Sequence, residues 1–275
     1  METLKMLKEK ATFIRIETLR IHQIAQETRV ASSLSPIEIF VALYYGKLLH
    51  VNPSNPRDEQ RDRFIISKGH GSISMYPLLA DMGFFDKDAL KKVCQEGTFL
   101  GGIPDPIIPG YETVNGSLGH GLGVGCGMAL GLKAKQKPQN VIVLTGDGEL
   151  DEGSNWEAIM FAPQHHLDNL TLIIDYNKVS MLDFSKNIID LNSLNAKFEA
   201  FHWDVFEVQE GHNIEEVYTC LKEAIYQRNG KPKVVIVNTI KGKGVPFLEK
   251  HSLSHILSVK PEDIEVLVKE LAHAN

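Results

Sequence analysis

The sequence predicts an α/β fold in which a doubly wound, mainly parallel sheet is flanked by helices. Four short runs of apolar and β-branched residues recur, at positions 141–144, 170–174, 205–208 and 234–237. Runs of this kind are typical of strands that a parallel sheet buries on both faces. Helical stretches at about 154–166 and 214–227 alternate with them, as a doubly wound sheet requires. With 275 residues, 43% of them hydrophobic, the chain can bury a substantial core.

The first third of the chain is expected to be helical. Apolar residues recur at helical spacing up to position 25. Ser35 followed by Pro36 resembles an N-cap with proline at the first helical position, so a second helix is expected from there to about Leu49. Pro53 and Pro56 then interrupt the helical pattern. The tail after position 260 is expected to form one short amphipathic helix.

Composition excludes several classes of function. The formal net charge is −6 and no stripe of lysine and arginine runs along the chain, so no nucleic-acid partner is expected. The chain has no apolar stretch of about 20 residues and no evident signal peptide, so no membrane association is expected. Its three scattered cysteines suit free thiols in a reducing compartment. We therefore expect a cytoplasmic protein in which residues 1–275 form a single domain with a helical N-terminal region.

Half of the glycines are concentrated in one segment. Residues 97–131 contain 11 of the 22 glycines. Apolar residues such as Leu118, Leu122 and Met128 are interleaved with them, which is not typical of a flexible linker. We expect backbone that approaches another group closely and leads into a tightly packed helix.

Oxygen-bearing side chains follow two of the predicted strands. Asp147 lies between Gly146 and Gly148 just after the first strand, and Asn177 follows the second. Ligands collect at the carboxyl ends of strands in an open α/β sheet. Magnesium prefers oxygen ligands and often bridges a carboxylate to a phosphate. A Gly-Asp-Gly turn is by itself compatible with an ordinary loop, but the position of Asn177 favours a site for Mg²⁺ and a diphosphate.

The segments around these residues resemble the transketolase family, whose enzymes use thiamine diphosphate. Gly-Asp-Gly followed about thirty residues later by Asn is similar to the thiamine-diphosphate motif. The more specific matches are residues 61–70 (RDRFIISKGH), 116–122 (GSLGHGL), 146–153 (GDGELDEG), 156–158 (WEA) and 241–244 (KGKG). They occur in order across about residues 30–256, so the resemblance covers most of the chain. It implies a thiamine-diphosphate-binding fold of the diphosphate-binding type.

The resemblance implies two cofactors and a set of residues to hold them. Mg²⁺ (or Ca²⁺) would be bound by Asp147, Asn177 and the backbone carbonyl of Val179. Thiamine diphosphate would contact His70, Gly116, Leu118, Gly146, Asp147, Gly148 and Asn177.

Three residues are implied as catalytic by the same resemblance. His70 would lie near the diphosphate and the reacting carbon. His255 falls on the catalytic histidine near the end of this domain, which also contacts the substrate. Glu152 stands where the family keeps a carboxylate at the subunit contact, in a network that links two cofactor sites. Lys241 and Lys243 are open to two interpretations, as cations that neutralise phosphate or as solvated loop residues.

The resemblance also implies a second polypeptide as partner. In this family the glutamate that activates the cofactor comes from the following pyrimidine-binding domain, across a dimer interface. That domain and the C-terminal domain are expected on a separate chain, the C-terminal transketolase-like subunit. The simplest assembly is a heterotetramer with two chains of each kind. Its substrates would be small sugars or keto compounds.

Two positions depart from the family pattern. The family's early histidine, which contacts donor and acceptor sugars, is Arg29 here, and a second sugar-facing histidine is Ile103. An arginine is permanently charged and cannot shuttle a proton near neutral pH. We therefore assign Arg29 to substrate binding, with substrates other than ordinary pentose phosphates or with a less hydroxylated two-carbon unit. The alternative is that Arg29 is a surface or interface residue and that the local alignment is wrong.

Three functions are open on this basis. The leading one is a two-subunit, transketolase-like transferase that moves a glycolaldehyde unit from a ketose donor to an aldehyde acceptor. The second is thiamine-diphosphate-dependent two-carbon transfer with a different donor or acceptor in specialised carbohydrate metabolism, which the loss of two imidazoles favours. The third is a catalytically idle scaffold subunit, which the retained metal ligands disfavour. The alpha subunit of a 2-oxoacid dehydrogenase also carries Gly-Asp-Gly, but the segments around Leu118 and Glu152 fit it poorly.

Overall fold

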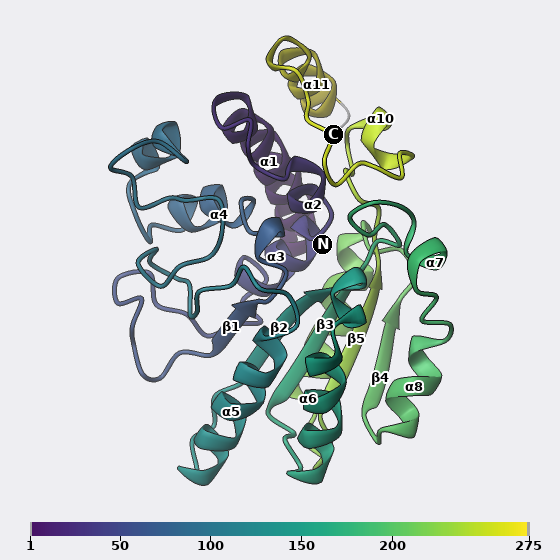
Figure 1. Ribbon diagram of the computed structural model, residues 1–275. Helices are drawn as coiled ribbons and strands as arrows, with labels where there is room; N and C mark the ends of the chain where they lie inside the picture. Colours follow the sequence, from purple (N-terminus) through teal and green to yellow (C-terminus); the bar gives the residue numbers. More distant parts are fainter. Residues whose placement is uncertain (1, 274–275) are drawn as a thin grey trace.

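A five-stranded parallel sheet forms the centre of the molecule (Figure 1). The computed structural model describes residues 2–273. The strands are β1 (Arg63–Ile66), β2 (Val141–Gly146), β3 (Leu170–Tyr176), β4 (Asp204–Val208) and β5 (Lys233–Asn238). They lie in the order β1-β2-β3-β5-β4, and each neighbouring pair is parallel. This arrangement confirms the predicted fold class.

The four runs predicted as strands are β2, β3, β4 and β5, each extended by one to two residues. The edge strand β1 was not predicted. It has only four residues and begins with the charged Arg63, so it shows neither a long apolar run nor a clear alternation. Its pairing with β2, in which Arg63 lies opposite Val141, brings the segment that ends in His70 next to the Gly-Asp-Gly turn.

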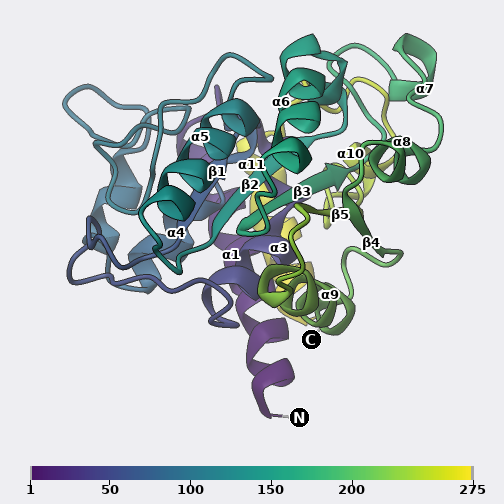
Figure 2. The ribbon, with the colours of Figure 1, turned by 90° about the horizontal axis from the view of Figure 1, so that it is seen from below.

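Helices cover both faces of the sheet, as Figure 2 shows in the view from below. One face carries α1 (Glu2–Ile24), α3 (Ile37–Tyr44) and α9 (Ile214–Tyr226), and the other carries α5 (Gly121–Ala134), α6 (Gly153–Gln164) and α8 (Leu194–Ala200). Successive residues of β2 enter opposite cores: Ile142 and Leu144 join the first, Val141 and Val143 the second. The centre of the sheet is therefore buried on both sides, which explains why β2 and β3 are mostly apolar.

The remaining elements lie mainly in the connections. They are α2 (Val30–Leu34), α4 (Met75–Asp81), α7 (Ser185–Ile188), α10 (Pro246–Glu249) and α11 (Pro261–His273), with short 3₁₀ turns at Gly69–Gly71, Lys87–Lys92 and Gly148–Asp151. Figure 1 shows α11 beside α1, so the last helix packs against the first. The predicted helices near 154–166, 214–227 and after 260 correspond to α6, α9 and α11.

The helix predicted from Ser35 to Leu49 was wrong at both ends. The helix α3 ends at Tyr44, and Pro36 occupies the N-cap position rather than the first helical turn. Ser35 has helical backbone angles and caps nothing within residues 2–273; its hydroxyl donates instead to the carboxylate of Asp175 at 2.5 Å. A tertiary contact has therefore taken the side chain that the local pattern assigned to capping.

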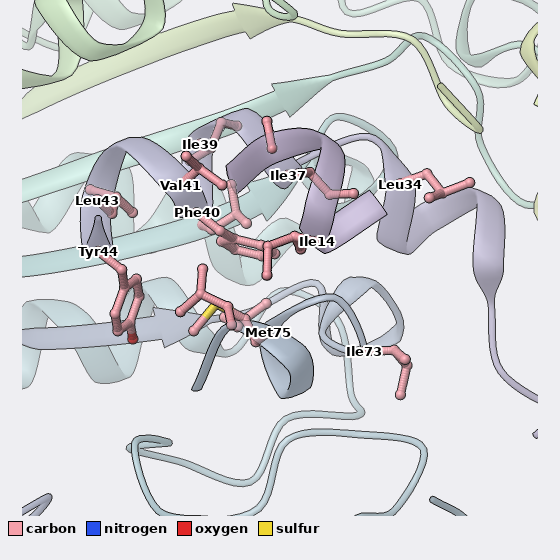
Figure 3. Packing of buried hydrophobic residues seen from close by; sticks show 14 of the residues in the cluster. Ile14, Leu34, Ile37, Ile39, Phe40, Val41, Leu43, Tyr44, Ile73 and Met75 are labelled. Carbon is pink, nitrogen blue, oxygen red and sulfur yellow. The ribbon is translucent and has the colours of Figure 1, made fainter. Parts of the chain in front are cut away.

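Every residue of α3 is buried, because this helix packs against α1 and α9 and, through Phe40, against Phe64 of β1. Figure 3 shows Phe40 of α3 against Ile14 of α1, with Met75 of α4 nearby. The one charged side chain of α3, Glu38, is 5% exposed and pairs with Arg15 and with His212 Nδ1, the latter at 2.9 Å. A buried carboxylate needs such partners, because its desolvation would otherwise be costly.

The helices and the cysteines relate to two expectations that were drawn from the composition. None of the helices within residues 2–273 is long and apolar enough to cross a lipid bilayer. Cys94, Cys126 and Cys220 are free thiols, as predicted.

His22 ties the C-terminal segment to the end of α1. The ring is fully buried, and its Nδ1 lies 2.7 Å from Thr28 Oγ1. The Thr28 hydroxyl already donates to the Ala25 carbonyl, so Nδ1 must carry the ring proton. Nε2 accepts from the Val259 amide at 3.3 Å. The imidazole is therefore neutral, and burial lowers the pKa of His22 to about 4.

We expect the free energy of unfolding to fall as pH decreases from about 6.5 to about 4. In that window the unfolded chain binds a proton at His22 that the folded chain excludes, so acid favours unfolding, by roughly 3 kcal/mol at most. Urea denaturation at several pH values measures this. The variant His22→Gln keeps a polar side chain without the titration, and we expect a flatter pH profile for it. An identical profile would contradict the assignment.

Candidate functional site

The predicted metal ligands lie at the carboxyl ends of two neighbouring strands. Asp147 directly follows β2, and Asn177 directly follows β3. The parallel register places Gly146 opposite Asp175, so the two strands end at the same level. The backbone amide of Asp147 also donates to the Asp175 carbonyl at 3.3 Å. The edge of the sheet thus brings Asp147 and Asn177 together, although they are 30 positions apart in the sequence.

A cavity of about 220 Å³ opens over this edge. Nine of the predicted site residues line it: His70, Gly116, Leu118, Gly146, Asp147, Gly148, Asn177, Val179 and His255. Lys68, Glu149, Ser180 and Lys241 also contribute. These residues come from the segment after β1, the glycine-rich loop, the ends of β2 and β3, and the loops after β5. The cavity therefore exists only in the folded chain.

Asp147 is the only acid among the predicted metal ligands. It is 2% exposed, and its Oδ2 accepts from the Lys178 amide at 2.8 Å and from the Ser185 hydroxyl at 2.9 Å. Burial raises the pKa of Asp147 to about 6, although the Ser185 hydrogen bond opposes this. The site therefore disfavours the ionised form of Asp147 as long as no cation is bound. A bound cation would stabilise the ionised form.

The neighbouring oxygens suit the same cation. The side-chain oxygen of Asn177 accepts from the Val179 amide at 3.2 Å and keeps a second lone pair. The Val179 carbonyl accepts from Lys241 Nζ at 2.7 Å, and a carbonyl oxygen has a second lone pair that a cation can use. Across residues 2–273 no group of three His, Cys, Asp or Glu side chains could hold a metal. One carboxylate, one amide and one carbonyl form a hard, oxygen-only donor set that fits Mg²⁺.

The structure distinguishes between the two interpretations of Lys241 and Lys243 that the sequence left open. It is 4% exposed and lines the cavity, so it is not a solvated loop residue. Burial, followed by the nearby charge of Lys68, lowers the pKa of Lys241 to about 7. Lys243, in contrast, is partly exposed and lies 3.9 Å from Glu249. Of these two lysines, only Lys241 is placed to neutralise an anionic group in the cavity.

A buried ion pair that the sequence did not predict lies beneath the site. Lys68 and Asp175 are 1% and 0% exposed and form a salt bridge. The hydroxyls of Ser35 and Thr239 also donate to the Asp175 carboxylate. Burial alone would raise the pKa of Asp175, but Lys68 and these hydrogen bonds hold it below its usual value. Asp175 is therefore saturated by protein groups and joins the ends of β1, β3 and β5 beneath the cavity.

Glu149 connects several segments beneath the glycine-rich loop. The sequence did not predict this role either. It is 2% exposed, and one of its oxygens accepts from the Ser67 hydroxyl and from the Gly119 amide, the latter at 2.9 Å. The other oxygen accepts from the Gly146 amide at 3.1 Å. A single carboxylate thus joins β1, the loop and β2. The sequence signal was a further acid two residues after Asp147, but its burial could not be foreseen.

The glycine-rich segment contains two kinds of glycine. Gly119 has φ +85°, and an added Cβ would lie 2.6 Å from the Cβ of Glu152. Gly125 packs onto β2, where a Cβ would lie 2.5 Å from Val143 Cγ2. Gly123, in α5, faces open space. The expectation of close backbone approach is therefore correct for part of the segment only.

We expect Gly119→Ala to destabilise the chain by about 1–3 kcal/mol, because alanine is strained at positive φ and its methyl group would displace Glu152. The matched control is Gly123→Ala, which should be neutral or stabilise α5 by about 0.5–1 kcal/mol. Urea denaturation of both variants makes the comparison. Equal effects of the two substitutions would refute the assigned role of Gly119.

The two predicted catalytic histidines lie against each other in the wall of the cavity. The ring centroids of His70 and His255 are 4.9 Å apart. Burial, assisted by Lys68, lowers the pKa of His70 well below its usual value, and burial with Lys241 lowers that of His255 to about 3. Lys241 Nζ lies 3.2 Å from His255 Nδ1, so this nitrogen acts as an acceptor and Nε2 carries the proton. Both rings are therefore neutral near pH 7.

The remaining predicted residues lie outside the cavity or at its margin. Ile103 lines it and is 44% exposed. Arg29 is exposed just before α2, near enough for its charge to contribute to the lowered pKa values of His70 and His255. Glu152 is exposed at the start of α6 and does not line the cavity. The structure therefore brings together the cofactor residues, but not Glu152 with them.

The fold and site define a class of protein: a parallel α/β domain with an oxygen-lined cavity at the carboxyl edge of its sheet. A family model described as the transketolase thiamine diphosphate binding domain matches residues 7–274. The chain belongs to the transketolase family, as the N-terminal, thiamine-diphosphate-binding part.

Curated relatives of similar length are named as subunits. The chain is 41% identical over 241 residues to an apulose-4-phosphate transketolase subunit of Actinobacillus succinogenes, covering 87% of this chain and 86% of that protein. It is 37% identical to the 6-deoxy-6-sulfo-D-fructose transketolase subunit SqwG of a Clostridium species, covering 96% of each. Both names describe a transketolase divided into subunits.

Solved transketolases share the fold but are longer. The transketolase of Campylobacter jejuni superposes with a TM-score of 0.88 at 30% identity, covering 98% of this chain and 43% of that one. The chain thus spans less than half of the solved transketolases that it matches. Their remaining part has no counterpart in residues 1–275.

Proposed function

We propose that this chain is the cofactor-binding subunit of a two-subunit transketolase that depends on thiamine diphosphate and Mg²⁺. It would transfer a two-carbon, glycolaldehyde unit from a ketose donor to an aldehyde acceptor. The observation that carries the proposal is the cavity in which Asp147, Asn177 and the Val179 carbonyl meet beside two buried lysines. This arrangement supports a cation-clamped diphosphate rather than a neutral ligand.

The chain's own residues would divide the work as follows. Asp147, Asn177 and Val179 would hold the cation, and Gly146 and Gly148 would let the backbone approach the diphosphate. When bound, the cofactor supplies the carbanion-stabilising chemistry, and the protein supplies position and electrostatics. His70 and His255, both neutral, would offer hydrogen bonds to substrate oxygens without adding charge.

The catalytic glutamate would come from a partner. We propose a C-terminal subunit with the pyrimidine-binding domain, assembled as two chains of each kind. The word "subunit" in the relatives' names supports a partner of some kind. The exposed position of Glu152, beside Gly119, suits a residue that contacts another chain and links two cofactor sites. A cytoplasmic location is part of this proposal.

Reconstitution tests this function. The chain is mixed with the product of a neighbouring reading frame that encodes a pyrimidine-binding domain, and ketol transfer is measured with Mg²⁺ and thiamine diphosphate. We expect activity only from the mixture. Turnover by this chain alone would refute the division of the enzyme into two polypeptides. A stable complex that binds cofactor but transfers nothing with any donor would support the idle-scaffold alternative.

A second candidate function differs from the first only in its substrate. Arg29 and Ile103 replace two sugar-facing imidazoles of the family, and the two relatives are named for apulose 4-phosphate and 6-deoxy-6-sulfo-D-fructose. We propose that this enzyme likewise uses a donor of specialised carbohydrate metabolism. A screen of these two ketoses against xylulose 5-phosphate, each with an aldehyde acceptor, decides the matter. A clear preference for xylulose 5-phosphate with ribose 5-phosphate would exclude altered specificity.

A further inference from the structure

The segment that follows β3 folds back on itself as a short hairpin, residues 178–185. The Ser185 amide donates to the Lys178 carbonyl at 3.0 Å. Between these two residues, Val179 and Phe184 form an isolated antiparallel bridge. The hairpin therefore returns the chain to the end of β3, where Ser185 begins α7.

Ser185 uses this position to hold the carboxylate of Asp147. Its hydroxyl donates to Asp147 Oδ2 at 2.9 Å. The Lys178 amide, at the other end of the hairpin, donates to the same oxygen at 2.8 Å. The second carboxylate oxygen, Oδ1, receives neither of these bonds. Two donors on one oxygen fix the orientation of the carboxylate and leave lone pairs of the other oxygen for a cation.

Ser185 acts from outside the cofactor cavity. Asp147 lines both the cofactor cavity and a neighbouring cavity of about 540 Å³, whereas Ser185 lines only the neighbouring one. Ser185 is therefore placed to touch Asp147 but not a ligand of the cofactor cavity. An effect of the Ser185 hydroxyl on such a ligand has to pass through Asp147.

The backbone of the hairpin is held in an unfavourable conformation. Lys178 has φ +64°, in the left-handed region that residues with a Cβ rarely adopt. Such a conformation costs on the order of 1–3 kcal/mol and persists only where surrounding contacts maintain it. The contacts here are the hydrogen bonds that join Lys178 to Asp147 and to Ser185. They maintain the turn that immediately precedes Val179, whose carbonyl belongs to the proposed donor set.

We propose that Ser185 is a positioning residue of the cation site. Its hydroxyl holds Asp147 by Oδ2, so that Oδ1 remains for the cation. The same bond anchors the hairpin that places the Val179 carbonyl beside Asp147. Ser185 itself contacts neither the cation nor the cofactor. This inference rests on the proposed function, because it requires that Asp147 and Val179 hold the cation.

Uptake of Mn²⁺ in the presence of thiamine diphosphate tests this role, with free Mn²⁺ measured by electron paramagnetic resonance. Ser185→Ala removes the hydroxyl and should weaken Mn²⁺ binding by about 10- to 100-fold, as loss of a group that orients a metal ligand usually does. Ser185→Thr keeps a hydroxyl at this position and should restore most of the affinity. Equal Mn²⁺ affinities of Ser185→Ala and the unmodified chain, or of Ser185→Thr and Ser185→Ala, would overturn the inference.

Asn187→Ala is the matched control. The Asn187 side chain donates to Asp183 Oδ2 at 3.0 Å within the same segment, but Asn187 lines neither of the two cavities. Its loss removes a hydrogen bond of the segment without touching Asp147, so Mn²⁺ affinity should not change. A loss as large as that of Ser185→Ala would mean that Ser185 only stabilises the segment, which contradicts the inference.

Hydrogen exchange separates a failure of this inference from a failure of the proposed function. It is measured at the Lys178 amide, in the chain without metal or cofactor. Exchange should be about fivefold faster in Ser185→Ala, because one hydrogen bond that anchors the hairpin is lost, and unchanged in Asn187→Ala. Unchanged exchange in Ser185→Ala would overturn the inference even if the chain binds the cation. If the unmodified chain takes up no Mn²⁺, the proposed function fails, and the role of Ser185 toward a cation fails with it.

Discussion

Replacing Asp147 by asparagine is expected to lower the affinity for thiamine diphosphate in the presence of Mg²⁺ by about 100-fold or more. Asparagine keeps the shape of the side chain but removes the only carboxylate of the proposed donor set. Loss of residues that merely support a metal ligand costs 10–100-fold, so loss of the anionic ligand itself should cost at least as much. Isothermal titration with Mg²⁺ present measures the change.

The control for this variant lies in the same segment. Asp151→Asn removes a carboxylate at the end of the adjacent 3₁₀ turn, which does not line the cofactor cavity. Its affinity should match that of the unmodified chain. If Asp147→Asn retained full metal-dependent affinity, the metal would have to bind elsewhere.

Lys68→Met is expected to cost about 3–5 kcal/mol of stability, measured by urea denaturation without cofactor. Methionine fills a similar volume, but the carboxylate of Asp175 would then be buried without its cationic partner. The hydroxyls of Ser35 and Thr239 would remain, and they cannot replace a full charge. Because Asp175 joins three strand ends, the loss should affect the whole fold.

Two further variants serve as controls for the Lys68→Met prediction. Asp175→Asn combined with Lys68→Met removes both charges, and the double variant should recover part of the loss. Lys178→Met removes an exposed lysine one residue after Asn177 and should change stability by no more than about 0.5 kcal/mol. If Lys68→Met behaved like Lys178→Met, the buried pair would contribute nothing.

The sequence carried most of the information about the cofactor residues. Strand ends are visible as apolar runs, so the positions of Asp147 and Asn177 at one sheet edge followed from the pattern. The resemblance extended the set to residues from distant loops, such as His70, Gly116 and His255, and the fold gathers them around one cavity.

The interactions beneath the cavity could not be predicted in this way. The roles of Lys68, Asp175 and Glu149 depend on burial and on partners 30 or more positions away, for which a local pattern gives no signal. The edge strand β1 was not predicted because it is short and begins with a charged residue. The helix start predicted at Ser35 was wrong because the Ser35 hydroxyl donates to Asp175 instead of capping the helix.

The most direct measurement is a crystal structure grown with thiamine diphosphate and Mn²⁺, whose anomalous scattering locates the cation. The account predicts one strong peak within coordination distance of Asp147, Asn177 and the Val179 carbonyl, with the diphosphate beside Gly146 and Gly148. A cofactor bound without a metal peak there, or a peak at other residues, would contradict it.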